Sequence, residues 1–469
     1  MTILLLLALV AAILAAWGSV ASRNPTDYFA AGRRGGVWLV GVAGTAAGVS
    51  AFTFVGGPGL FALVGAGSLW MILSAPLTGA LQCWVAGEPI VRLARGGAIL
   101  TVPELVAACA GRPAQAVAAL VIVVGSVASL AVQTKAAAVL GAVFLGVEGT
   151  LAALVAMSAT ALYTALGGMR AGLVADAVQG GVMAVVAAGL AAWALAAADG
   201  PAAALHTLSA HRPELLGSFG AVPPAQAFAW YALFCLGTLA QPHYLQKFLF
   251  LSDRSQLRWL PAVLTGALAT TLTVWLGVGL AGSALVARGQ LELTHPDDLA
   301  PRLVALLGPW AVALAGTAAL AALMSTSASF LNLAAAAVTR DLPASLGWAP
   351  RGVAAARLAT LLVVATAIAL GLASDRAVAM LGLLGWGFFT AALLPTVALG
   401  LAWDSVRPVA AATAMAAGAI VDLSLEAVRP ALPRGLEPGL AGAAVGTLVL
   451  VGLSLLANRT ARAVPRGRR

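Results

Sequence analysis

The chain has 469 residues, of which 61% are hydrophobic and only 9% are charged, with a formal net charge of +9. Soluble domains carry about 25% charged residues, so this chain cannot cover itself with a wetted surface, and a soluble globular protein is excluded. The positive charge does not indicate nucleic-acid binding, because the basic residues are spread along the chain and form no basic domain.

The apolar runs determine the class of fold. Only α-helices and closed barrels satisfy their backbone hydrogen bonds inside lipid, and these runs, rich in Ala, Leu, Val and Gly, lack the alternating pattern of barrel strands. We therefore predict an all-α membrane protein with about 13 transmembrane helices of roughly 20 apolar residues each. The expected spans are 2–20, 36–62, 66–88, 116–146, 149–168, 173–198, 225–249, 258–287, 302–338, 353–374, 377–402, 407–427 and 438–457.

The first span lies in the segment 1–22, which could be a signal peptide or a retained helix. Signal peptides normally carry a positive n-region, and this start has none. We therefore expect 1–22 to form a leading transmembrane helix.

The basic residues set the expected orientation. If the N-terminus lies outside, 19 of the 26 Lys and Arg residues fall in inner loops and ends, six fall outside, and Lys135 lies within a span. Positive residues concentrate on the cytoplasmic side of membrane proteins. We expect a multi-pass protein of a bacterial-type cytoplasmic (inner) membrane, with its N-terminus outside and its C-terminus cytoplasmic.

Two of the expected spans contain clustered helix breakers. The span 36–62 holds the run Gly56-Gly57-Pro58-Gly59, and the span 225–249 holds Gly237 followed by Gln241-Pro242-His243. In transporters built from inverted repeats, Gly- or Pro-interrupted helices in corresponding positions of two halves mark the binding site. Gly and Pro are also ordinary in membrane helices, so kinks without function remain an alternative.

Each of these two spans opens a run of five, and the runs cover 36–198 and 225–402. An odd number of spans per run inverts the second relative to the first. The spacing therefore predicts a 5+5 inverted-repeat core with broken first and sixth core helices, as in leucine-transporter-type folds. The remainder, 403–469, is expected to hold two additional helices and a basic cytoplasmic tail.

Lys135 places a positive charge well inside an expected span. Lys135 lies in the span 116–146, and a Lys there costs about 2.5–3.5 kcal/mol on insertion scales, so a functional role is the first expectation. It could pair with a substrate carboxylate or replace a second cation. Alternatively, its long side chain could extend to the interface.

Hydroxyl groups gather in the span 302–338. The run Ser325-Thr326-Ser327-Ala328-Ser329 interrupts a helix otherwise rich in Ala and Leu. Neutral hydroxyls and freed backbone carbonyls can replace the water around a hard cation such as Na⁺. Ser and Thr also mediate close helix packing in membranes, so the hydroxyls alone leave both interpretations open.

Six ordered motifs resemble the solute:sodium symporter family. They are Asn24-Pro25-Thr26-Asp27-Tyr28-Phe29-Ala30-Ala31-Gly32-Arg33, Thr101-Val102-Pro103-Glu104, Tyr163-Thr164-Ala165-Leu166-Gly167-Gly168-Met169-Arg170 with Asp176 and Gln179-Gly180, Gln241-Pro242-His243 with Lys247-Phe248, Ala322-Leu323-Met324-Ser325-Thr326, and Thr339-Arg340-Asp341-Leu342. They extend over some three hundred residues. The resemblance implies Na⁺-coupled uptake of a small organic solute by alternating access, with Na⁺ as the coupling ion.

The resemblance also implies specific site residues. Asp176 matches an acid on the inward exit of the ion, although it could instead be a surface-facing acid beside Arg170. The Na⁺ ligands are implied to be the carbonyls of Ala46, Val49 and Ala322 and the hydroxyls of Ser325 and Thr326.

Two positions depart from the family pattern. Members often carry Asp or Asn beside the sodium ligands of the first core helix, where this chain has Gly48. Proline-type members carry an aromatic residue one turn before Gln-Pro-His, where this chain has Thr238. Both departures argue against assigning proline as the substrate.

The solute is expected to contact the two breaks and the helices that face them. Small polar and aromatic groups suit a small, partly polar solute, and Lys135 favours a monocarboxylate or an amino acid. Any of these residues could instead pack the bundle. The expected substrate-binding residues are Ser50, Thr53, Gln133, Lys135, Phe234, Thr238, Gln241 and Trp386.

Three other classes of function are alternatives to Na⁺-coupled transport. H⁺-coupled or uncoupled transport could use Asp176 and His243, and a transporter-like membrane sensor would need a separate signalling partner. An intramembrane enzyme is not expected, because the spans hold no His-Glu-x-x-His or Gly-x-Ser-x-Gly motif and no paired acids. The expected partners are a small-molecule solute and the lipid bilayer. Nucleic acid is not expected, and no oligomer is implied.

Overall fold

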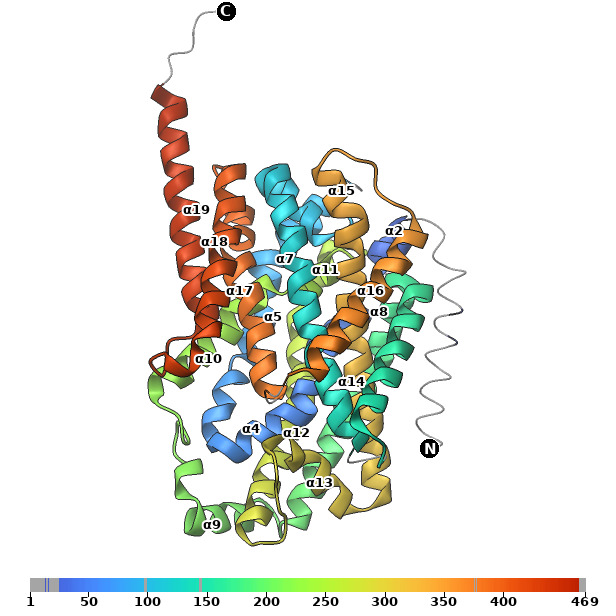
Figure 1. Cartoon of the computed structure of the whole chain (residues 1–469), viewed down its shortest axis with the longest axis vertical. Coiled ribbons are helices and arrows are strands. Elements are labelled where there is room, and N and C mark those ends of the chain that lie inside the picture. Colours follow the sequence, from blue (N-terminus) through green and yellow to red (C-terminus); the bar gives the residue numbers. More distant parts are fainter. Residues whose placement is uncertain are drawn as a thin grey trace, which may run out of the picture.

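The computed structural model describes residues 25–96, 99–142, 146–374, 376 and 378–463, together with residues 13 and 16. The described chain is helical throughout, apart from connecting loops and one isolated parallel bridge between Gly35 and Leu251 (Figure 1). The expected leading helix at 1–22 lies outside the described residues except for these two positions.

The helices before residue 200 include several short segments, in which η marks a 3-10 or π-helical turn. The bounds are α2 (Pro25–Ala30), η1 (Ala31–Arg33), α3 (Val37–Gly48), η2 (Phe52–Gly56), α4 (Gly57–Val64), η3 (Gly65–Met71), α5 (Ala75–Leu81), η4 (Gln82–Gly87), α6 (Glu88–Ala94), α7 (Val102–Leu140) and α8 (Gly149–Ala197).

The remaining helices lie after residue 200. Their bounds are α9 (Pro201–His211), η6 (Pro213–Leu215), α10 (Pro224–Gly237), η7 (Thr238–Ala240), α11 (Pro242–Phe248), η8 (Arg254–Arg258), α12 (Leu260–Ala287), η9 (Pro296–Asp298), α13 (Leu299–Leu307), α14 (Pro309–Ala336), η10 (Ala337–Asp341), α15 (Leu342–Ser345), α16 (Val353–Leu372), α17 (Val378–Ala402), α18 (Pro408–Ala427), η11 (Arg429–Ala431) and α19 (Pro438–Ala463).

Nine helical stretches among the described residues are long and apolar enough to cross a membrane. The sequence predicted about 13 spans. The difference has physical causes. The helices α3 and α10 are broken after 12 and 14 residues and are too short to count alone, and the stretch Gly149–Ala197 counts once although it covers two expected spans. The leading span falls largely on undescribed residues.

Left-handed glycines divide two of the long stretches. Gly111, with φ 81°, separates a short first part of α7 from the rest, and Thr101 caps the start by accepting a hydrogen bond from the Glu104 N–H. Gly168, with φ 59°, divides α8 at the point where the sequence separated 149–168 from 173–198. A Cβ on Gly168 would lie 2.7 Å from the Tyr28 ring, so that position needs glycine for space as well as for backbone conformation.

One expected boundary is wrong. The span 302–338 was expected to be continuous, but Gly308, with φ 102°, ends α13 and starts α14. Pro309 follows at the first position of α14, where its missing N–H costs no hydrogen bond. The membrane-crossing helix therefore begins at Pro309.

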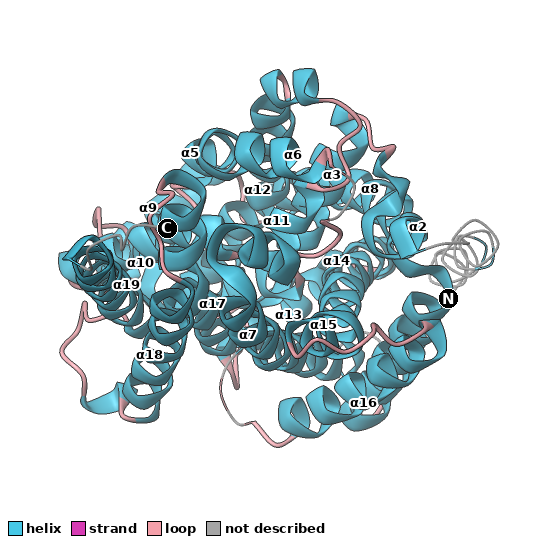
Figure 2. Ribbon diagram, turned by 90° about the horizontal axis from the view of Figure 1, so that it is seen from above, coloured by secondary structure: helices cyan, strands magenta, loops and turns pink. Residues whose placement is uncertain are grey.

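The centre of the bundle is formed by α8 and α14, which pack against each other and against α3, α7 and α12. Around this centre, α16, the α5–α6 segment and the α18–α19 pair lie on the periphery (Figure 2). The α18–α19 pair packs closely on α17 through glycines. A Cβ on Gly418 would lie 2.1 Å from the Ala391 carbonyl oxygen, and one on Gly439 would lie 2.5 Å from the Gly387 Cα. Small residues allow such backbone approach in membranes.

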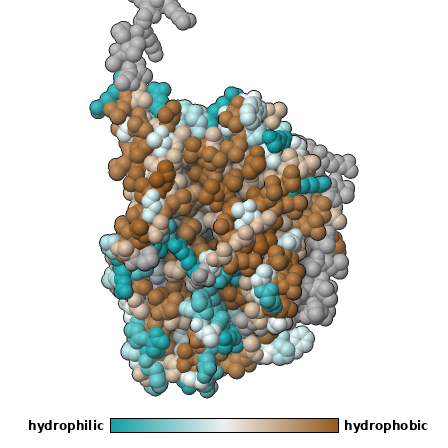
Figure 3. All heavy atoms as spheres, viewed as in Figure 1, coloured by the Kyte–Doolittle hydropathy of each residue, from teal (hydrophilic) through white to brown (hydrophobic). Residues whose placement is uncertain are grey.

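The outer surface is rich in apolar side chains. Leu362, Leu448 and Val185 are 61%, 74% and 74% exposed. Hydrophobic residues cover much of the face in Figure 3, and hydrophilic ones gather mainly toward its lower end. A soluble monomer does not expose apolar surface on this scale, so the described fold is that of a multi-pass membrane protein.

Candidate functional site

The first interrupted helix ends at Gly48. Val49 has an extended backbone (φ −85°, ψ 107°), and its N–H donates to the Thr45 carbonyl at 2.8 Å as the last bond of α3. The chain resumes a helical course at η2 and α4, with Pro58 in the first turn of α4. The interruption therefore lies before the Gly56–Gly59 run, and it releases carbonyls at the end of α3.

Hydroxyl groups of α14 donate hydrogen bonds to the carbonyls at this end of α3. The Ser325 hydroxyl donates to the Ala46 carbonyl at 2.9 Å, and the Thr326 hydroxyl donates to the Ala47 carbonyl at 3.1 Å. Ser325 also lies 3.1 Å from the Ala322 carbonyl, and Thr326 lies 3.5 Å from the Val49 carbonyl. The five expected ligand residues thus lie in one buried place, with Ser325 in contact with Ala46 and Ala322 and Thr326 in contact with Val49, although the two segments are 279 residues apart.

The second interrupted helix breaks at Gln241. This residue is extended (φ −73°, ψ 112°) between η7 and α11, and Pro242 follows with no N–H to donate. The Gln241 carbonyl accepts from the N–H groups of Tyr244 and Leu245 at 3.1 Å and so caps α11. Its side-chain amide donates to the Trp386 carbonyl at 3.2 Å, which joins the break to α17.

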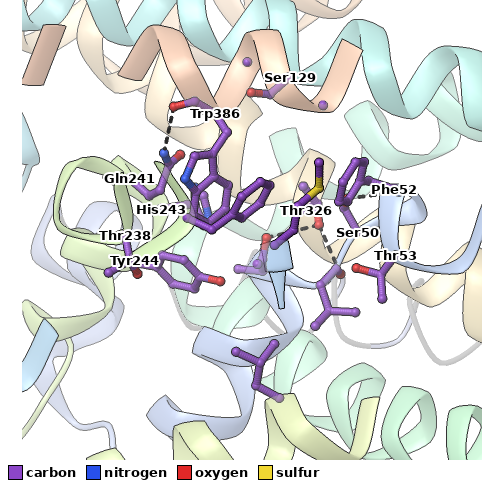
Figure 4. A pocket seen from close by; sticks show the side chains of 18 of the residues that line it. Ser50, Phe52, Thr53, Ser129, Thr238, Gln241, His243, Tyr244, Thr326 and Trp386 are labelled. Atoms are coloured by element: carbon purple, nitrogen blue, oxygen red, sulfur yellow. Dashed lines mark hydrogen bonds between the residues drawn. The ribbon is translucent and has the colours of Figure 1, made fainter. Parts of the chain in front are cut away.

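A cavity of about 120 Å³ lies between the two breaks. Figure 4 shows side chains from both breaks, α17 and α14 turned toward this common space. No Asp, Glu, Lys or Arg is present among the described lining residues. Seven of the eight expected substrate residues line the cavity, namely Ser50, Thr53, Gln133, Phe234, Thr238, Gln241 and Trp386.

Aromatic rings form much of the wall. Phe234 stacks on Trp386 with ring centroids 4.9 Å apart, and Phe52 stacks on Phe234 at 6.4 Å. The Trp386 indole N–H donates to the Leu233 carbonyl at 3.2 Å, which fixes the orientation of the ring. Such walls suit the apolar body of a small solute.

Polar groups of the wall are partly engaged already. The Gln133 side-chain oxygen accepts from the Ala51 N–H at 3.3 Å, so α7 supports the first break. Thr238 is hydrogen-bonded to the Gln82 amide. Both residues therefore hold the cavity in shape as well as line it.

His243, which the sequence indicates as a motif residue and a possible proton carrier, lines the cavity. It is 3% exposed, and neither ring nitrogen has a hydrogen-bond partner among the described residues. Its ring centroid lies 4.4 Å from that of Tyr244 and 4.9 Å from that of Phe330. A buried polar group without a partner is costly, so the free nitrogens are available to a polar group of a solute. The sequence feature that could have predicted this position is that His243 directly follows Pro242 at the break.

Tyr244 explains the departure at Gly48. A Cβ on Gly48 would lie 1.7 Å from the Tyr244 hydroxyl oxygen and 2.3 Å from the ring carbon that bears it. The space that Asp or Asn would need beside the ion ligands is therefore filled by a tyrosine from α11. Sequence reasoning alone could not pair residues that are so far apart in the chain.

Asp176 is buried and forms an ion pair. Its Oδ2 lies 2.7 Å from the Lys247 Nζ, and the two side chains are 2% and 5% exposed. The alternative of a surface acid beside Arg170 is wrong, because Arg170 lies 3.6 Å from Asp27 instead. The lysine partner comes from α11, directly beyond the second break, and no local sequence pattern predicts this pairing.

Lys135 does not join the other substrate residues. It is absent from the cavity wall, and its Nζ donates to the Ser374 carbonyl at 2.9 Å in the loop before α17. The structure therefore places Lys135 outside the cavity wall, contrary to the expectation that it contacts the solute. A long side chain near the end of a helix can extend to a polar partner at the interface, and Lys135 does so.

Three of the motifs meet at one end of the bundle. Arg340 lies 2.7 Å from Glu104, and the Thr101 hydroxyl donates to the Asp341 carboxylate at 2.6 Å. Arg33 is hydrogen-bonded to the carbonyl of Ala94, the last residue of α6, and to that of Ile99 in the loop before α7. These contacts join η1 to the connection between α6 and α7, and the start of α7 to η10.

Comparisons with known proteins agree with this geometry. A model of the "Sodium:solute symporter family" matches residues 28–418. The chain is 27% identical to the sodium/pantothenate symporter of Escherichia coli (strain K12), over 84% of this chain and 83% of that protein. It is 26% identical to the osmoregulated proline transporter OpuE of Bacillus subtilis (strain 168), over 93% and 90%.

A solved structure shares the fold. The substrate-bound, outward-open state of a Na⁺-coupled sialic acid symporter superposes with a TM-score of 0.82 at 16% identity, and the match covers 97% of each chain. The family resemblance read from the motifs is confirmed.

Proposed function

This chain belongs to the sodium:solute symporter family, and from that premise we propose that it imports a small organic solute together with Na⁺ by alternating access. Na⁺ is the coupling ion, and the protein is a transporter rather than an enzyme. The observation that carries the proposal is the contact of Ser325 and Thr326 with carbonyls at the end of α3, beside a cavity formed by two broken helices.

The proposed ion site consists of five oxygens. A cation would replace the hydroxyl protons that now point at carbonyls, because hydroxyl lone pairs can then turn toward the ion. Neutral oxygen ligands suit Na⁺, a hard cation, and need no buried carboxylate. The proposed ligands are the carbonyls of Ala46, Val49 and Ala322 and the hydroxyls of Ser325 and Thr326.

Asp176 is proposed to act on the inward exit of the ion. It lies on α8, one of the helices that pack around α14, and Lys247 neutralises it in this conformation. An ion leaving the site would compete with the ammonium for the carboxylate. Opening of the inner end would therefore involve movement of α11, which carries Lys247.

The proposed solute site is the cavity between the breaks. Its aromatic walls would hold the apolar part of the solute, and its hydroxyl, amide and imidazole groups would bind the polar part. A monocarboxylate or an amino acid is favoured, since pantothenate and proline, which the names of the two relatives give, are both carboxylates. The bound Na⁺, rather than Lys135, would supply the positive charge for the carboxylate.

The architecture proposed for the complete chain follows the sequence prediction. It has about 13 helices, a leading helix at 1–22, inverted repeats at 36–198 and 225–402, and two further helices in 403–469. The interruptions at Val49 and Gln241, each in the helix that opens a repeat, support this division. The excess of Lys and Arg on one side supports an outer N-terminus and a cytoplasmic C-terminus in a bacterial inner membrane.

The test is uptake by the purified protein in vesicles. Small carboxylates and amino acids are first screened by thermal stability with and without Na⁺, because a ligand of the folded state raises the unfolding temperature. Uptake of each hit is then measured with Na⁺ replaced by choline at fixed pH. Loss of uptake in choline is expected. Equal uptake in both media would favour H⁺-coupled or uncoupled transport, and stabilisation without any uptake would favour a sensor.

A further inference from the structure

A second hollow of about 660 Å³ opens at the surface between α6 and η8. It is lined by Trp84, Glu88, Arg95, Asp253, Arg254 and Arg258, among others. Both walls lie at the end of the bundle that holds α11, since α6 packs against α11 and η8 follows it in the chain. The hollow shares no residue with the cavity between the breaks.

The charges of this groove do not cancel. Arg254 pairs with Glu88, and Arg95 lies 3.9 Å from Asp253. Hydrogen bonds from the Ser255 backbone N–H lower the pKa of Asp253, so this acid stays ionised and its charge is counted. Arg258 adds a further positive charge. It has no carboxylate or hydrogen-bond partner in the described part of the chain, and its guanidinium lies over the Trp259 ring at 5.3 Å.

Exposed apolar side chains lie in the groove wall and in the segments next to it in the chain. Trp84, in the wall of the groove, is 76% exposed, and Leu73 and Leu77, earlier in the same segment, are 53% and 50% exposed. Trp259, the residue after the wall residue Arg258, is 60% exposed. In a membrane protein the exposed leucines face acyl chains. Tryptophans gather where hydrocarbon meets the headgroup layer. The groove thus lies at the membrane–water boundary, with an apolar track on its membrane side.

We propose that this groove binds the headgroup of an anionic phospholipid, with the acyl chains along Leu73 and Leu77. Guanidinium groups bind phosphate oxygens through paired hydrogen bonds, and basic pockets between membrane helices retain anionic headgroups. The apolar track selects a bilayer lipid over a free phosphate, because only a lipid fills both parts. The inference does not rest on the identity of the transported solute.

The test compares two exposed arginines. Arg258→Gln removes the uncompensated charge of the groove, and Arg434→Gln, in the loop between α18 and α19, removes an exposed arginine that likewise lacks a partner among the described residues. The full chain is purified in neutral detergent and titrated with phosphatidylglycerol or phosphatidylcholine. Bound lipid is counted by native mass spectrometry, and the unfolding temperature is recorded. We expect phosphatidylglycerol to bind and stabilise the wild type and R434Q, and its affinity to fall about fivefold in R258Q.

Three results would overturn the proposal. These are equal phosphatidylglycerol affinity in R258Q and R434Q, equal binding of phosphatidylcholine, and displacement of the lipid by millimolar glycerol phosphate. If R258Q does not purify as a folded protein, Arg254→Gln tests the same expectation. An unchanged phosphatidylglycerol affinity in that variant would count equally against the groove.

Discussion

Removing Lys247 alone should destabilise the protein more than removing Lys247 and Asp176 together. The two groups are 2.7 Å apart and almost completely buried. A single replacement, Lys247→Met, leaves a buried carboxylate without its partner, and breaking such a pair costs about 3–5 kcal/mol. The double variant Lys247→Met/Asp176→Asn leaves no charge, and replacing a buried pair with uncharged groups is often close to neutral. Both single losses enter the cycle and the small loss of the double variant is subtracted, so the coupling between the two sites should be at least about 3–5 kcal/mol.

The assay is thermal unfolding in detergent, with the four proteins of the cycle measured side by side. We expect the unfolding temperature to fall in K247M and in D176N and to return most of the way to the wild-type value in the double variant. The matched control is Arg212→Met, because Arg212 and Glu214 form an exposed pair and such pairs contribute roughly 0–1 kcal/mol. If K247M unfolds like the wild type, or if the double variant is as unstable as the worse single one, the reasoning about the buried pair is refuted.

Three further predictions concern the ion and solute sites. Ser325→Ala and Thr326→Ala each remove one proposed Na⁺ ligand, so the Na⁺ concentration needed for half-maximal uptake should rise at least about tenfold, which is the effect of roughly 1.4 kcal/mol; unchanged Na⁺ dependence in the double variant would contradict the site. His243→Ala should weaken solute binding by about 1–3 kcal/mol, if an otherwise unpaired imidazole bonds the solute, and the thermal stabilisation by a saturating solute with fixed Na⁺ measures it; an unaltered solute titration would remove His243 from the site. Gly48→Ala should disturb the fold and so abolish uptake, because the added methyl overlaps Tyr244. The double variant Gly48→Ala/Tyr244→Ala should again give folded protein in size-exclusion chromatography. Failure of that recovery would show that the clash is not the cause.

Much of the bundle is predictable from hydropathy because each crossing must be a long apolar helix. The bounds expected for α12, α16 and α17 differ from those of the structure by two residues or fewer at each end. Breaks inside apolar segments are harder to locate, since Gly and Pro lower helix stability without fixing where the backbone departs. The run Gly56-Gly57-Pro58-Gly59 stays helical, whereas Val49, an unremarkable residue in sequence, takes the extended conformation.

Candidate site residues could be predicted where their side chains differ in chemical type from the apolar residues around them. Ser325 and Thr326 stand out in an Ala-rich helix, and Gln241 precedes a proline. Partners across the fold were not predictable. Lys247 is 71 residues from Asp176, and nothing local shows that it meets this acid rather than water. Lys135 gave the opposite error, because a charge in an apolar span does not reveal which way its flexible side chain extends.

Val49 and Thr326 belong both to the proposed set of ion ligands and to the cavity wall. Because the same Val49 and Thr326 groups contact both ligands, a change in their positions on Na⁺ binding also changes the wall that the solute meets. Occupancy by the metal should therefore complete the chamber for the organic guest, and the energetic benefit must be equal in both directions. With such a shared wall, the states that hold only Na⁺ or only the solute are disfavoured. Uncoupled movement of either species down its own gradient is therefore limited.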